Sequence, residues 1–220
     1  MIKALIFDFD GLILETEEPV YTAWEEIFQE YGCHLPLEVW TKIIGTSDFN
    51  FHPLTELERQ YGAKLDRDDV LKRKWQREME LIMARDAIPG VRTYLEDARR
   101  MGLKIGLASS SGCDWVTNHL KRLELFDYFD CIKGSDDVQQ TKPAPDLFLA
   151  VLADLNIAPQ EAIVLEDSPN GILAAKRAGI YCVAVPNTMT EGLDFKNADF
   201  RLNSLEDLSL EELIVRVEQG

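Results

Sequence analysis

The sequence lacks the patterns that mark disulfide-rich, zinc-binding and membrane-spanning proteins. Its four cysteines are widely spaced and form no C-x-x-C pair, and its histidines do not pair at the spacing of a zinc site. No apolar run approaches the ~18 residues that a transmembrane helix needs. The first apolar residues meet an aspartate too early for the core of a signal peptide. We therefore expect free thiols and a cytoplasmic protein.

Basic stretches are also missing. The 220 residues include 23 Lys and Arg against 39 Asp and Glu, which gives a net charge of −16. Such a balance repels polyanions, so nucleic acid and anionic membrane surfaces are excluded as partners. An anionic substrate would need local positive charge from a metal ion or a positioned lysine. The sequence does not indicate an oligomeric state.

What the sequence does contain is a regular alternation of strand-like and helix-like segments. Four short apolar runs each end in polar or turn residues, and a helical pattern precedes each of the last three. The runs are Ala4 to Phe9, Leu103 to Ala108, Ala162 to Leu165 and Ile180 to Val185. This alternation predicts an α/β protein with a mainly parallel sheet and helices on both faces.

One stretch differs from the rest. Between Thr16 and Ala84 the pattern is helical throughout, with an amphipathic stripe that ends at Gly32 and a charged helix from Asp66 to Arg85. We expect a helical insertion over residues 16–84, and a core formed by residues 1–15 and 85–220.

Two aspartates follow the first strand. Asp8 and Asp10 are two residues apart, so in an extended chain their side chains share a face and Phe9 points into the core. Ligands of open α/β sheets bind beyond the carboxyl ends of the strands, where this pair lies. The D-x-D-G pattern alone is equally compatible with a solvated acidic turn.

Other reactive groups end two further strands. Ser109 follows the second run, Glu166 and Asp167 follow the third, and Lys142 stands in a loop before a proline. Singly, these are a helix cap, a polar turn and a surface cation. Jointly, they predict one site at the rim of the sheet.

Carboxylates without cysteine or clustered histidine form a hard oxygen site suited to Mg²⁺. A phosphate dianion meeting a carboxylate is repelled, since two unit charges 4 Å apart cost ~4 kcal/mol at an effective dielectric of 20. Mg²⁺ and Lys142 would offset this repulsion and make Asp8 usable as a nucleophile. Asp10 would then act as general acid and base.

These residues together resemble the motifs of the haloacid dehalogenase superfamily, in its β-phosphoglucomutase and phosphoglycolate phosphatase branch. The matching motifs are Asp8-Phe9-Asp10-Gly11, Ser109, Lys142-Pro143-Ala144-Pro145-Asp146 and Glu166-Asp167-Ser168. The resemblance implies a Rossmann-like three-layer core with a mobile helical cap inserted after the first strand.

The resemblance also implies roles for the site residues. Asp8 would be the nucleophile and Asp10 the acid/base, and Ser109 and Lys142 would bind the phosphoryl group. Mg²⁺ would be held by Asp8, the Asp10 backbone carbonyl and Asp167, with Glu166 as a direct or indirect ligand. We expect Gly11, Thr16 and Ser110 to line the phosphate site as well.

The leading hypothesis is a Mg²⁺-dependent phosphatase of a small phosphorylated metabolite, acting through an aspartyl-phosphate. A phosphomutase is the alternative, but β-phosphoglucomutases carry cations where this chain has Val20, Ile44 and Asp48. A non-catalytic regulator is disfavoured by the helical insertion. The chain also departs from its relatives at the predicted hinge between core and cap, where Glu15 replaces the usual aspartate.

Overall fold

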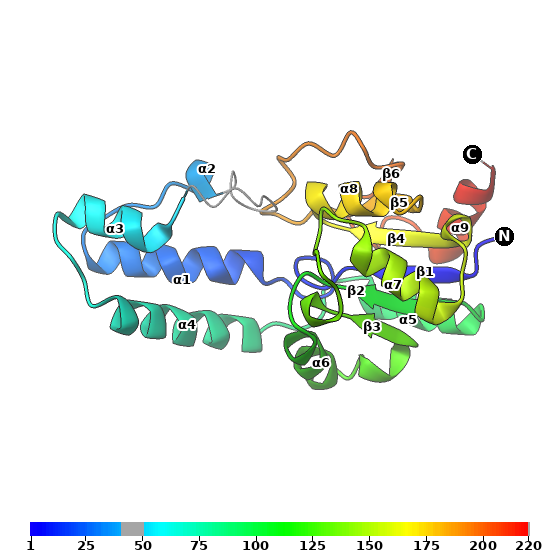
Figure 1. Cartoon of the computed structure of the whole chain (residues 1–220), viewed down its shortest axis with the longest axis horizontal. Coiled ribbons are helices and arrows are strands. Elements are labelled where there is room, and N and C mark those ends of the chain that lie inside the picture. The colour runs from blue at the N-terminus through cyan, green and yellow to red at the C-terminus, as the bar shows by residue number, and fades with distance from the viewer. Residues whose placement is uncertain (41–50, 220) are drawn as a thin grey trace. The chain divides into compact units, whose positions relative to one another are not determined.

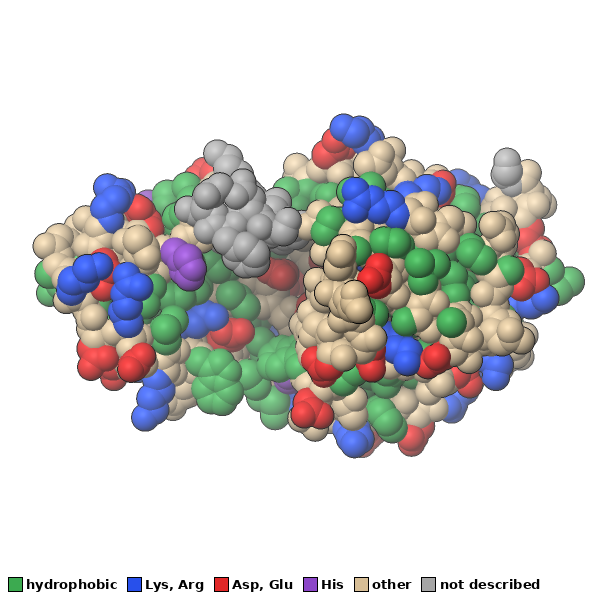
Figure 2. Space-filling model, in the orientation of Figure 1, with side chains coloured by type: hydrophobic (Ala, Val, Ile, Leu, Met, Phe, Trp, Pro, Cys, Tyr) green, Lys and Arg blue, Asp and Glu red, His purple; other side chains and the backbone are tan. Residues whose placement is uncertain are grey.

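The computed structural model describes residues 1–40 and 51–219 of the chain. Two compact units are present: the core, formed by Met1–Leu14 and Ala87–Gly220, and the cap, formed by Glu15–Asp86. Among the described residues, none of the helices combines the length and the hydropathy needed to cross a bilayer. On the face shown in Figure 2, basic side chains are interspersed with acidic ones.

The core contains a six-stranded sheet in which every paired strand is parallel to its neighbours, in the order β3-β2-β1-β4-β5-β6 (Figure 1). The strands are β1 Ala4–Phe7, β2 Lys104–Ala108, β3 Cys131–Lys133, β4 Ala162–Glu166, β5 Tyr181–Ala184 and β6 Phe200–Arg201. In register, Phe7 of β1 lies beside Leu107 of β2 and Leu165 of β4. The carboxyl ends of these three strands therefore meet at one edge.

Helices cover both faces of the sheet. They are α5 Val91–Arg100, α6 Cys113–Arg122, α7 Asp146–Leu155, α8 Pro169–Arg177 and α9 Leu210–Gln219, with 3-10 turns at Phe126–Tyr128, Ser135–Asp137 and Pro159–Glu161. Helices α7 and α8 share an apolar cluster with Ile6 and Val164 of the sheet, whereas α5 packs on β2 and α9. The predicted α/β core, with a helical segment inserted after the first strand, is confirmed.

Local signals in the sequence set the ends of the core helices. Gly102 and Gly179 follow α5 and α8 with φ of +72° and +77°, a left-handed conformation that glycine adopts without strain. At the start of α8, the Ser168 hydroxyl accepts a hydrogen bond from the Gly171 amide at 3.1 Å, and Pro169 occupies the first helical position. Helix α8 thus begins two residues after Asp167.

Two expectations need correction. The first strand ends at Phe7 rather than Phe9, because after Asp8 donates its amide to Leu165 the chain turns at Gly11, whose φ is +79°. Strands β3 and β6 were missed, since three- and two-residue strands leave no apolar run in the sequence. Phe9 is fully buried, as predicted.

The cap is helical in all its described elements. Its helices are α1 Glu17–Glu30, α2 Leu37–Trp40, α3 Pro53–Tyr61 and α4 Arg67–Met83. The predicted stripe on α1 is buried at Trp24, Ile27 and Phe28, and α1 packs along α4. The Glu15 carboxylate accepts the amides of Glu17 and Glu18 at 2.9 and 3.1 Å and so caps α1. The Glu15 carboxylate therefore stabilises the first turn of α1.

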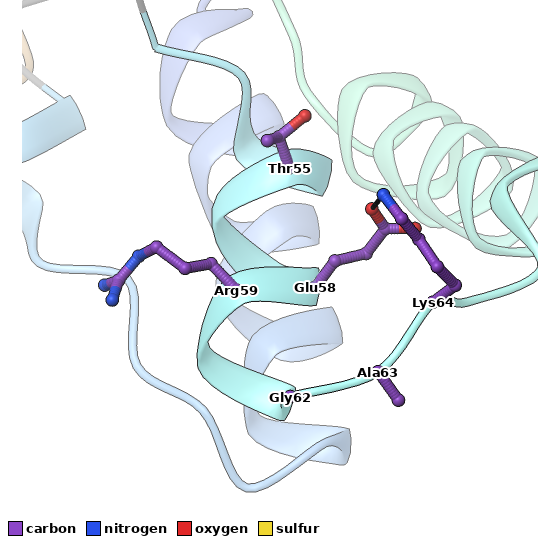
Figure 3. Close-up of a pocket in the computed structure, with 6 residues that line it drawn as sticks. All are labelled: Thr55, Glu58, Arg59, Gly62, Ala63 and Lys64. Atoms are coloured by element: carbon purple, nitrogen blue, oxygen red, sulfur yellow. Dashed lines mark hydrogen bonds and ion pairs between the residues drawn. The ribbon is translucent and has the colours of Figure 1, made fainter.

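A buried glutamate joins α3 to α4. Figure 3 shows Glu58 beside Lys64, next to an open pocket of about 420 Å³ on the turn between the two helices. The Glu58 carboxylate lies 2.7 Å from Arg67 Nη2 and 2.8 Å from Lys64 Nζ, and it accepts the Leu65 amide at 3.2 Å. Hydrogen bonds from Arg67 and Lys64 lower the pKa of Glu58 to about 2.

We expect Glu58→Gln to destabilise the α3–α4 turn, because an amide cannot replace a carboxylate that holds two cations and an amide proton. Hydrogen exchange of amides in α3 and the first turn of α4 should become faster at pH 7. Since the pKa is lower in the folded state, the stabilisation by wild-type Glu58 is present above about pH 4.5 and fades as the pH falls toward 2. Exchange in the two proteins should then converge.

The control is Glu80→Gln, which removes a carboxylate from an exposed pair with Arg77. Exposed pairs contribute little, so this variant should exchange like the wild type. Equal exchange rates in the wild type and the Glu58 variant at pH 7 would contradict the structural role.

Candidate active site

Three buried carboxylates meet where β1 and β4 end. Asp8, Glu166 and Asp167 each present an oxygen, and these oxygens all lie within 4.8 Å of one another. The strand order reverses direction between β1 and β4, which is where open α/β sheets bind their ligands. An all-oxygen, anionic set of this kind fits a hard divalent cation such as Mg²⁺.

A buried lysine lies against the cluster. Lys142 Nζ is 2.5 Å from Asp8 Oδ1 and 2.6 Å from Glu166 Oε1, and the lysine side chain is only 6% exposed. Burial and the Glu166 carboxylate raise the pKa of Asp8 to about 7, against the opposing effect of Lys142. Burial alone would lower the pKa of Lys142, but Asp8 and Glu166 hold it above its usual value.

These charges do not cancel. One ammonium lies against a cluster of three carboxylates, so the four side chains together carry a net charge of −2 when all are ionised. Repulsion from the Glu166 carboxylate adds to the larger effect of burial in raising the pKa of Asp8, because like charges disfavour one another's ionisation. A divalent cation would restore neutrality, and this charge balance is a second observation that fits Mg²⁺.

Asp10 occupies different surroundings. Its Oδ2 accepts hydrogen bonds from Ser111 Oγ at 2.7 Å and Ser109 Oγ at 3.3 Å, and its Oδ1 accepts one from Trp115 Nε1 at 3.1 Å. Ser109 is fully buried and its hydroxyl also accepts the Ser111 amide at 2.9 Å. The two aspartates therefore reach the same edge but differ in the contacts described: Asp8 contacts a charged ammonium, and Asp10 accepts hydrogen bonds from two hydroxyls and an indole.

Two glycines allow the acidic groups to approach the backbone. A Cβ atom at Gly11 would lie 2.2 Å from Asp167 Oδ2, and one at Gly171 would lie 1.9 Å from the Glu166 carboxyl. Neither distance is possible for real atoms. Gly11, predicted to line the phosphate site, is thus required for the position of Asp167.

Asn187 is a site residue that the sequence analysis did not identify. Its Nδ2 donates to Asp167 Oδ2 at 2.8 Å and to the Gly11 carbonyl at 3.1 Å. Its Oδ1 accepts the amides of Met189 and Thr190, which fixes the orientation of the side-chain amide. Only its place after the fourth apolar run could have pointed to it.

Most predicted site residues of the core lie together. Asp8, Asp10, Gly11, Ser109, Lys142, Glu166 and Asp167 are linked by the contacts above. Ser110 is exposed at the end of β2, and Thr16 is buried in the cap. Val20 lies in α1, whereas Ile44 and Asp48 lie outside the described residues. Ser111 and Trp115 were not predicted, because their link to Asp10 spans about a hundred residues of chain.

Comparison with known proteins places this geometry in a family. The model of the haloacid dehalogenase-like hydrolases matches residues 5–185. The chain belongs to this family. It is 48% identical over 214 residues to the YhcW protein of Bacillus subtilis, covering 97% of each chain.

Two further relatives resemble the chain over most of its length. A phosphorylated carbohydrates phosphatase of Thermotoga maritima is 33% identical over 194 residues, covering 87% of this chain and 88% of the relative. The crystal structure of CbbY from Rhodobacter sphaeroides in complex with phosphate superposes with a TM-score of 0.75 at 30% identity, covering 97% of this chain and all of that one. The family predicted from the motifs is confirmed.

We expect Asn187→Ala to weaken Mg²⁺ binding by about 10- to 100-fold, because Asp167 loses the donor that orients it. Isothermal titration calorimetry with MgCl₂ measures this without any turnover. Asn203→Ala, at an exposed position of the core, is the matched control and should bind Mg²⁺ like the wild type. An unchanged affinity in a folded Asn187 variant would show that Asp167 needs no such support.

Proposed function

We propose that this protein is a Mg²⁺-dependent phosphatase that hydrolyses a small phosphorylated metabolite through an aspartyl-phosphate. The observation that carries the proposal is the Asp8 carboxylate, buried beside the Lys142 ammonium and within 4.8 Å of the ligand oxygens of Glu166 and Asp167. Membership of a hydrolase family and a carbohydrate-phosphate phosphatase among the relatives support it.

The residues that would hold Mg²⁺ are Asp8, Asp167 and the backbone carbonyl of Asp10, with Glu166 either a direct ligand or held beside the ion by Lys142. When bound, the ion supplies positive charge that offsets the negative charge of the phosphoryl oxygens. A chain of net charge −16 needs local positive charge to bind an anionic substrate, and the ion together with Lys142 would provide it.

In the first half-reaction, an Asp8 oxygen forms a bond to phosphorus as the bond from phosphorus to the ester oxygen breaks. The Asp10 carboxyl gives its proton to the departing oxygen, which leaves as an alcohol. Lys142 Nζ and the Ser109 hydroxyl stabilise the charge on the transferring phosphoryl group. The products are the alcohol and the phosphorylated Asp8.

In the second half-reaction, a water oxygen forms a bond to the same phosphorus, and the bond from Asp8 to phosphorus breaks. Asp10, now a carboxylate, takes the proton of the water and returns to its starting form. Inorganic phosphate is released and Asp8 becomes a carboxylate again. Asp10 therefore acts in both half-reactions. Its carboxyl group must keep the same orientation toward the leaving oxygen and the attacking water.

The helical cap, to which Thr16 belongs, is the part of the chain that would select the substrate. A phosphomutase would run the first half-reaction but return the phosphoryl group to a bound sugar instead of water. Val20 offers no charge to hold a second phosphate, so hydrolysis is the better supported outcome.

We expect Asp8→Asn to reduce turnover by a factor on the order of 10⁴ or more, because an amide cannot replace the nucleophile. Phosphate release is measured over a panel of sugar phosphates with MgCl₂. Asp194→Asn, an exposed aspartate paired with Lys196, is the control and should retain full activity. Retained hydrolysis in the Asp8 variant would exclude the nucleophile assignment, and a bisphosphate formed without free phosphate would indicate a mutase.

Removal of divalent metal should abolish phosphate release. We expect activity to fall to background in excess EDTA and to return with Mg²⁺, while Ca²⁺ restores less because it prefers more ligands at longer distances. The measurement is phosphate release after dialysis, with calcium and magnesium at equal concentration. Full activity in EDTA would contradict the metal requirement.

A further inference from the structure

Helix α6 holds the Asp10 carboxyl from one side. Trp115 lies in the first turn of the helix, and its indole Nε1 donates to Asp10 Oδ1 at 3.1 Å. Ser111, just before the helix, donates its hydroxyl to Oδ2 at 2.7 Å. The carboxyl group is thus held at both oxygens, which a single donor could not achieve.

Trp115 is itself held in place. Its ring meets the His119 ring edge to face, with centroids 4.3 Å apart at 67°. His119 is buried one helical turn further along and lies 6.3 Å, centroid to centroid, from the Phe9 ring. Helix α6 therefore contacts both Phe9 and Asp10, two consecutive residues of the loop that carries Asp8.

We propose that Trp115 is a positioning residue that sets the direction of the Asp10 carboxyl through its hydrogen bond to Oδ1. This inference rests on the proposed function of Asp10 as general acid and base. The indole N–H donates to Oδ1, whereas the ring nitrogen has no acceptor capacity.

The difference between the two oxygens follows from their partners. The N–H of Trp115 fills one acceptor position of Oδ1 and cannot itself accept a hydrogen bond, so it favours the unprotonated form of that oxygen. Oδ2 faces the hydroxyls of Ser111 and Ser109, which donate to a carboxylate and turn to accept from a carboxylic acid. Both protonation states that the reaction needs are therefore accommodated without a change of side-chain direction.

The test uses Trp115→Phe, which keeps an aromatic ring beside His119 and removes the N–H donor together with part of the indole ring. Two substrates of nearly the same shape separate proton donation from binding: phenyl phosphate, whose phenolate needs a proton to leave, and 4-nitrophenyl phosphate, whose weakly basic phenolate leaves without one. We expect kcat to fall about 10-fold or more for phenyl phosphate and less than about 3-fold for 4-nitrophenyl phosphate.

Trp75→Phe is the matched control, since Trp75 is 62% exposed on α4 of the cap. It should leave the ratio of the two kcat values unchanged. Equal losses on both substrates in the Trp115 variant, with an unchanged melting temperature, would overturn the proposal. An unchanged kcat for phenyl phosphate would do the same.

A second measurement does not depend on turnover. The protein has four tryptophans, and the Trp115→Phe and Trp75→Phe variants assign two of the indole N–H signals in a ¹⁵N–¹H spectrum. Asp10→Ala should shift the Trp115 signal strongly and leave that of Trp75 in place.

An unmoved Trp115 signal would overturn the proposal whatever the activity. Conversely, if the wild type released no phosphate from any ester while the signal shifted, the Trp115 contact would stand and the proposed function would be lost. The two failures are therefore distinguishable.

Discussion

The arrangement of the site depends on one buried interaction, the Lys142 ammonium between the carboxylates of Asp8 and Glu166. Removing an ammonium from water costs several kcal/mol unless it is paired, and removing one partner of a buried pair leaves an uncompensated charge. Asp8 follows β1 and Glu166 ends β4, so this pairing links the ends of neighbouring strands to the loop before α7. With Asp167 added, negative charge exceeds positive, and the excess makes the edge of the sheet attractive to a divalent cation.

The carboxylates of this cluster are also closely packed against their neighbours. At Gly11 and Gly171 any side chain would occupy the space of the Asp167 or Glu166 carboxyl. Asn187 holds Asp167 from the other side, and backbone amides fix the orientation of that asparagine. The charged groups are thus held by rigid neighbours, which suits the proposed reaction, in which a nucleophile, a phosphate ester and a cation would meet within a few ångströms.

The two aspartates of the first motif lie in different surroundings, which fit the separate roles proposed for them. Asp8 lies among charged groups, where a nucleophile can be balanced against a phosphate dianion, whereas Asp10 lies among hydroxyls and an indole. Pairs of carboxylates in different surroundings are the usual basis for assigning nucleophile and acid/base roles. Helix α6 and the residues just before it contribute to this difference, because Trp115 and Ser111 donate hydrogen bonds to the second aspartate.

Local pattern in the sequence was enough to predict the main strands and the helical insertion, because periodicity depends on neighbouring residues. It also placed reactive groups at strand ends, and parallel strands bring such ends to one edge. The tertiary structure alone decided that Lys142 contacts both Asp8 and Glu166, that Asn187 supports Asp167 and that Trp115 holds Asp10. Those contacts join residues from about 20 to more than 130 positions apart, and strand order and register bring them together.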